Sequence, residues 1–154
     1  MEAIQSESDF KQRLAQLDAR SQQQFALRLV DAVRGYCDDG RLLSVLAAVE
    51  RNDGSPAELE SAAKSARAMV VSLHTRCGAD GDWAAQAGYF VARAADVLIR
   101  GLLRPEDNLA YRVAQNCRMA ATCVAVDGET EAGAKQMAIQ WGLLDDYLAE
   151  QRGK

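Results

Sequence analysis

The apolar residues of this chain recur at helical spacing from one end to the other, and no stretch alternates as a half-buried strand does. Several of these amphipathic segments are rich in alanine, the residue with the highest helix propensity. The pattern therefore predicts an all-α fold of six or seven helices. The expected helices span residues 8–19, 21–37, 41–51, 56–77, 83–103, 107–126 and 131–151.

Local signals mark where some of these helices begin and end. Ser55 can cap a helix, Pro56 suits the first helical position, and Glu58 can reach back to the amide of the cap. Ser21 is the expected cap of the second helix. Gly78 is the expected end of the fourth helix, because glycine is common just beyond helix C-termini.

The length and the spacing of the helices predict one domain, residues 1–154, with an ordered core over 8–151 and a frayed tail at 152–154. The segment 83–103 is apolar nearly all round, which is typical of a helix buried on most sides. Short connections favour antiparallel neighbours. We therefore expect a single compact bundle of antiparallel or orthogonal helices around a buried, alanine-rich central helix.

Charge and composition exclude several classes of function. The net charge of −4 comes without a dense basic segment, so general nucleic-acid binding is not expected. The first 13 residues lack the apolar run of a secretory signal, and charges such as Arg93, Asp96 and Arg100 interrupt the longest apolar stretch. The four cysteines are widely spaced within helical patterns, as in proteins of a reduced compartment. We expect a cytoplasmic protein that binds neither membrane nor nucleic acid.

Few residues of the chain are candidates for metal binding or catalysis. His74 is the only histidine, and with Cys77 it forms a His-x-x-Cys pair on one helix face. A zinc site needs about two further ligands, and Cys37, Cys117 or Cys123 are the remaining cysteines that other helices would have to supply. The favoured interpretation is free, buried thiols and an ordinary histidine. We expect no metal, no cofactor and no catalytic residue.

Paired carboxylates occur at Asp38 and Asp39 and again at Asp145 and Asp146. Aspartate-rich helices can hold magnesium against a diphosphate, but that chemistry needs two clusters facing a deep pocket in a longer chain. The first pair lies at a predicted helix end, and the second falls outside the apolar stripe of its helix. Both pairs are expected to face solvent.

Acidic residues gather at predicted turns next to a tryptophan. An aromatic side chain flanked by acids can anchor a contact with a basic protein. The alternative is that the turns are simply polar and that Trp83 belongs to the core, as is expected of Trp141. The candidate partner-binding residues are Asp80, Asp82, Trp83, Asp127, Glu129 and Glu131.

The run AAQAGYFVARAA, residues 84–95, resembles the alanine-rich central helix of the all-α immunity proteins of bacterial polymorphic toxin systems. The succession of short alanine-rich helices over 25–126 is similar as well. The resemblance implies an intracellular bacterial protein that binds one cognate toxin domain and blocks its active site or its substrate. Mild acidity suits a basic toxin such as a nuclease.

The leading hypothesis is therefore a non-enzymatic, protein-binding domain, and specifically an immunity protein that neutralises a cognate toxin. A second hypothesis is a helical homodimer that acts as an adaptor or chaperone, with the first and last helices paired across a two-fold axis. A third is a bundle that binds a small molecule, or a metal at His74 and Cys77.

Overall fold

Helices make up almost all of the chain that the structure describes. The computed structural model describes residues 2–51, 55–80, 83–125 and 131–154. The elements are α1 (Glu7–Ala15), α2 (Ala19–Val33), the 3-10 turn η1 (Arg34–Tyr36), α3 (Arg41–Arg51), α4 (Pro56–Asp80), α5 (Trp83–Leu103), α6 (Leu109–Cys123) and α7 (Ala132–Arg152). No strand occurs within these ranges, so the predicted all-α fold is confirmed.

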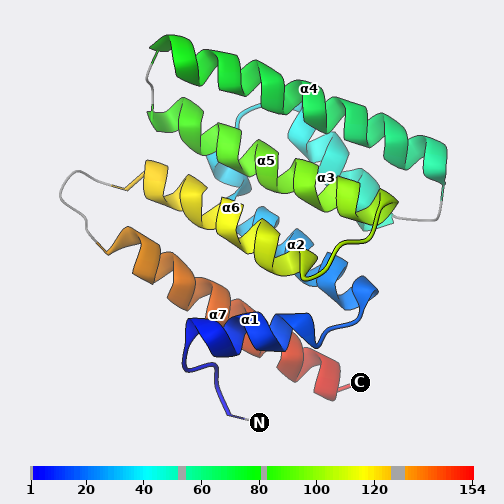
Figure 1. Cartoon of the computed structure of the whole chain (residues 1–154), viewed down its shortest axis with the longest axis vertical. Coiled ribbons are helices and arrows are strands. Elements are labelled where there is room, and N and C mark those ends of the chain that lie inside the picture. Colours follow the sequence, from blue (N-terminus) through cyan, green and yellow to red (C-terminus); the bar gives the residue numbers. More distant parts are fainter. Residues whose placement is uncertain (1, 52–54, 81–82, 126–130) are drawn as a thin grey trace.

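The helices are arranged in two layers. Helices α4, α5 and α6 lie side by side and alternate in direction, and α2 and α3 pass behind them (Figure 1). Helix α7 continues the series beside α6, and α1 lies near α7 at the end of the molecule where both chain termini are found. This order is what short connections between successive helices favour.

Helix α5 is the central helix, as its all-round apolar composition predicts. It packs most extensively against α4 and α6, and its alanines at 87, 92, 94 and 95 are fully buried. Gly101 permits the close approach of α6, because a Cβ atom there would lie 2.6 Å from both Cδ atoms of Leu109. Small residues thus bring the backbones of this layer together.

Several of the predicted helix boundaries are wrong. Helix α1 ends at Ala15 rather than at residue 19, α2 ends at Val33 rather than at residue 37, and α6 spans Leu109–Cys123 rather than 107–126. The start of α2 and the end of α4 also differ from the prediction. Asp18 caps α2, because its Oδ1 accepts a hydrogen bond from the Ser21 amide at 2.7 Å, and Ser21 lies within the first turn. Helix α4 continues through Gly78 to Asp80. A glycine inside a helix costs only about 1 kcal/mol, which the packing of α4 on α5 can offset.

The predicted start of α4 is confirmed. The Ser55 hydroxyl accepts a hydrogen bond from the Glu58 amide at 3.4 Å, and the helix begins at Pro56.

Over the part of the chain that the structure covers, no helix combines the length and the apolar composition that crossing a membrane requires.

Candidate functional site

Four helix ends lie on one side of the molecule: the C-termini of α4 and α6 and the N-termini of α5 and α7 (Figure 1, left). Trp83, the first residue of α5, is 66% exposed. Val124, directly after α6, is 38% exposed, and the side chain of Glu131 before α7 is also exposed. We call Trp83, Val124 and Glu131 the Trp83 end. Exposed large apolar side chains at helix ends, with an acidic residue at the same end, suit contact with another macromolecule.

Two of the six candidate partner-binding residues, Trp83 and Glu131, lie at this end, at the starts of α5 and α7. Trp83 is not a core residue, so that alternative interpretation is wrong: as the first residue of α5, the indole is not covered by a neighbouring helix. Glu131 makes no side-chain capping hydrogen bond. Asp82, Asp127 and Glu129 lie outside the described residues, and so does the side chain of Asp80, the last residue of α4.

One carboxylate of each pair has a structural role, whereas Asp38 and Asp146 are exposed as expected. Asp39 forms an ion pair with Arg41 at 2.6 Å, and the hydrogen bond from this guanidinium lowers the pKa of the Asp39 carboxyl. Asp145 was expected to face solvent, but it is half-buried and accepts a hydrogen bond from the Ile4 amide at 3.3 Å. The N-terminal segment, whose Ile4 side chain is buried, covers it.

All four cysteines are free thiols, and only Cys117 is buried as predicted, because the other three are half-buried. Burial raises the pKa of the Cys117 thiol to about 12, and burial also raises the pKa of Cys37 and of Cys123. A thiol with a raised pKa stays protonated at neutral pH and is a weak nucleophile.

His74 does not lie in the core, because its side chain is exposed on α4 and its ring lies 5.3 Å from the ring of Tyr89. Cys77, one turn further along, is half-buried. Among the described residues no three side chains of His, Cys, Asp or Glu are grouped so that they could hold a metal ion.

A half-buried polar cluster that the sequence did not predict joins α1, α6 and α7. Arg118 of α6 forms an ion pair with Glu7 of α1 and donates a hydrogen bond from Nε to Gln140 of α7 at 2.6 Å. The Trp141 indole and the Tyr111 hydroxyl each donate to Glu7 at 3.3 Å. Burial raises the pKa of Glu7, but Arg118 and these donors lower it more, so the net pKa lies below its usual value. Trp141, expected in the core, is thus only half-buried.

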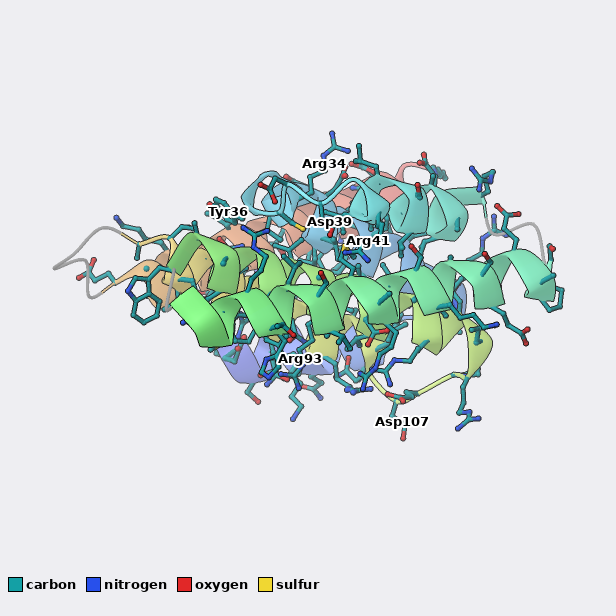
Figure 2. The ribbon with its side chains drawn as sticks, turned by 90° about the horizontal axis from the view of Figure 1, so that it is seen from above. Arg34, Tyr36, Asp39, Arg41, Arg93 and Asp107 are labelled. Carbon is teal, nitrogen blue, oxygen red and sulfur yellow. The ribbon has the colours of Figure 1, made fainter. Side chains whose placement is uncertain are left out.

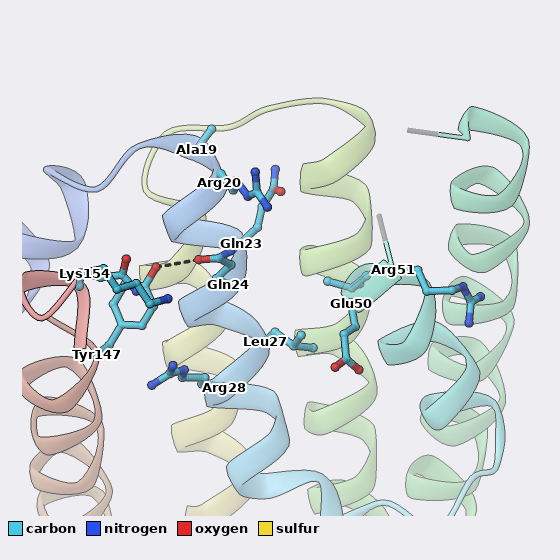
Figure 3. Close-up of a pocket in the computed structure, with 12 residues that line it drawn as sticks. Ala19, Arg20, Gln23, Gln24, Leu27, Arg28, Glu50, Arg51, Tyr147 and Lys154 are labelled. Atoms are coloured by element: carbon cyan, nitrogen blue, oxygen red, sulfur yellow. Dashed lines mark hydrogen bonds between the residues drawn. The ribbon is translucent and has the colours of Figure 1, made fainter. Parts of the chain in front are cut away.

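An open groove of about 720 Å³ lies between α2, α3 and the end of α7 (Figure 3). Its wall is polar: the Tyr147 hydroxyl donates a hydrogen bond to Gln24 at 3.0 Å, and the Arg28 guanidinium lies 4.9 Å from the centre of the Tyr147 ring. Arg28 is also paired with Glu150. Among the described residues that line the groove, Glu50 is the one acidic side chain, and no serine, cysteine or histidine is present to pair as nucleophile and base.

Comparison of the chain with protein-family models, with curated proteins and with solved structures gave no match. Function therefore has to be inferred from the residues of this chain and from their geometry.

Proposed function

We propose that this chain is a non-enzymatic, protein-binding domain whose partner docks at the Trp83 end. The observation that carries the proposal is the 66% exposure of Trp83 on the side of the molecule where four helix ends lie. Tryptophan is enriched among the residues that dominate binding energy at protein interfaces. Val124 at the same end of the molecule adds exposed apolar surface, and Glu131 adds negative charge.

The exposed indole area allows an estimate of the binding energy. A tryptophan side chain can bury roughly 200 Å². With two-thirds of that area open, its burial in a partner's pocket would contribute about 3 kcal/mol at 25 cal/mol per Å². That corresponds to a factor of roughly 100 in Kd.

Within this proposal, we infer that the partner is a cognate bacterial toxin domain and that the chain is its immunity protein, acting in the cytoplasm. The resemblance of residues 84–95 to the central helix of all-α immunity proteins supports this narrower proposal. The residues that flank Trp83 in the sequence, Asp80 and Asp82, together with Glu131, carry negative charge and suit a basic toxin such as a nuclease.

A homodimer through the first and last helices receives less support from the geometry. The apolar residues of α1, Phe10 and Leu14, are fully buried within the monomer, so α1 keeps no free apolar face for a second copy. Sedimentation at high protein concentration tests this alternative directly.

The test combines cell protection with capture of the toxin. Cells that express the toxin encoded beside this chain should survive when the wild-type chain is co-expressed, and purified toxin should bind it in a one-to-one complex. Trp83→Ala should weaken binding by about 100-fold, whereas Ile139→Ala, which truncates a residue 52% exposed on α7, should change Kd less than about threefold.

Failure of the wild-type chain to protect would refute the immunity role. Equal binding by the Trp83→Ala and wild-type chains would instead refute the docking site and leave the immunity role in place. The two levels of the proposal therefore fail in distinguishable ways.

A further inference from the structure

The layer of α4, α5 and α6 has one face turned toward α2 and α3 and one face that no described helix covers (Figure 1). Figure 2, seen from above, shows Arg93 on one side of α4 and Tyr36 and Asp39 on the other. Arg93 therefore lies on the uncovered side. We call this surface, with the side chains assigned to it below, the α4–α6 face.

Helical spacing and register place further arginines on this face. Arg100 lies two turns beyond Arg93 on α5, so both point the same way. The ring contact of His74 with Tyr89 sets the antiparallel register of α4 and α5. Arg67, seven residues before His74, therefore lies level with the residue seven positions after Tyr89.

That residue is Asp96, which lies between Arg93 and Arg100 on the same side of α5. Its side chain is only 2% exposed, and Oδ2 lies 3.0 Å from the Arg100 guanidinium. Its Oδ1 is buried without a hydrogen-bond partner in the part of the chain that the structure describes. A buried, half-paired carboxylate is costly unless nearby cations offset it, so Asp96 is best explained as the counter-charge beneath a cluster of arginines.

The whole chain has a net charge of −4, whereas this face carries a small excess of positive charge. Its acids are Asp96, Glu60 near the start of α4, Glu106, which is paired with Arg112, and Asp107, which Figure 2 shows on the same side as Arg93. Arg67 and Arg93 form no ion pair with any described residue. The exposed cations assigned to this face are Lys64, Arg67, Arg93, Arg100 and Arg112, whereas Arg76 of α4 acts on Asp39, on the other side.

Apolar side chains share the face with these cations. Val71, one turn after Arg67, is 54% exposed, and Met119, two turns after Arg112, is 47% exposed. Arginine combined with methionine and other apolar residues is typical of protein interfaces. Phosphate backbones need a denser basic surface and gain nothing from exposed valine or methionine.

We propose that the α4–α6 face is a second interaction surface, which binds an acidic segment of a partner protein. Carboxylates of the segment pair with Arg67 and Arg93, and its apolar residues pack on Val71 and Met119. Asp96 holds Arg100 in place one turn further along α5. The surface is distinct from the Trp83 end, and the proposal does not rest on the function proposed above.

A synthetic peptide of alternating glutamate and leucine tests the proposal on the full chain. Its fluorescence anisotropy gives Kd, and backbone amide shifts in NMR spectra locate the contact. The informative variant is Arg67→Glu with Arg93→Glu. Its control is Arg20→Glu with Arg34→Glu, which makes the same change in net charge at two exposed arginines of α2 and η1.

We expect salt-sensitive binding, amide shifts concentrated on α4 to α6, and a loss of roughly tenfold or more in affinity for the informative variant only. Equal losses in both variants would overturn the proposal, because the peptide would then be sensing net charge alone. Absence of binding to a folded wild-type chain would also overturn it. So would tighter binding of a single-stranded oligonucleotide to the same face, because the surface would then be one for nucleic acid.

Discussion

Replacing Arg118 with methionine should destabilise the fold more than any other single change of an ion pair described here. The Arg118 side chain is 14% exposed and its partner Glu7 is 30% exposed, so the pair is partly desolvated. Methionine keeps an unbranched apolar stem against Phe10, over whose ring the guanidinium lies at 5.4 Å. The substitution therefore removes charge and hydrogen bonds while most of the packing is retained.

The size of the effect follows from the groups left behind. Breaking a fully buried ion pair costs about 3–5 kcal/mol, and the partial exposure of Glu7 lowers this to roughly 2 kcal/mol. The Gln140 side chain is fully buried and loses its Arg118 donor, which costs about 1 kcal/mol more. The predicted loss is about 3 kcal/mol, or roughly 10 °C in Tm for a domain of this size.

Urea unfolding followed by far-ultraviolet circular dichroism measures the loss, with Arg34→Met as the control. Arg34 is paired with Asp31, but both side chains are more than half exposed, so its loss should cost at most about 0.5 kcal/mol. A double-mutant cycle with Glu7→Gln should give a coupling energy of about 2 kcal/mol between Glu7 and Arg118. Additive single changes, or an Arg118→Met variant as stable as Arg34→Met, would refute this account of the cluster.

Four further results are expected. The pKa of Glu7 in the folded state lies below its ordinary value of 4.5, so its ion pair contributes fully to the free energy of unfolding above that value. The contribution is lost as the pH falls through the lower, folded pKa. Glu7→Gln should therefore weaken the decrease of the unfolding free energy at acidic pH. Gly101→Ala should cost about 1–3 kcal/mol, since the new Cβ would meet Leu109, and it should be measured by urea unfolding. Cys117 should react with a thiol reagent only after denaturation, whereas the half-buried Cys123 should react in the native state. Trp83→Ala should change stability by less than about 0.5 kcal/mol and remove the more solvent-exposed component of tryptophan fluorescence.

Each of these results has an outcome that contradicts it. If Glu7→Gln left the decrease of the unfolding free energy at acidic pH unchanged, Glu7 would not be charged and paired in the native state. A stable Gly101→Ala variant would mean that α6 can move away from α5 at little cost. Rapid labelling of Cys117 in the native protein would contradict its burial. A large loss of stability in Trp83→Ala would indicate that Trp83 packs in the core.

Much of the fold could be predicted from local signals. The helices at 41–51 and 83–103 have the predicted bounds, because clear breaks flank strongly apolar stripes. Ser55 caps as expected, since its hydrogen bond is made within its own turn. The errors at Ser21 and Gly78 occurred where two local signals competed or where packing outweighed a weak helix breaker.

The candidate site was harder to predict. Trp83 could be assigned to a helix start, but its exposure depends on whether another helix covers it. The pairing of Glu7 with Arg118 joins residues 111 positions apart, and the sequence contains no periodicity that would indicate it. Likewise, Asp96 reads in the sequence as a charge that interrupts an apolar helix, and only the neighbouring helices bury it.

The sequence by itself determined that the chain is helical, where most helices lie and which of them is central, because capping, periodicity and all-round apolarity act within one or two turns of chain. Only the tertiary structure decided which surfaces stay open. Packing α2 and α3 against one side of the α4–α6 layer leaves the other side uncovered, with Arg93 on it and Arg67 assigned to it by helical register. The exposure of a side chain depends on which helices pack around it. The pairing of helices that are far apart in the sequence is decided by the burial of the whole core.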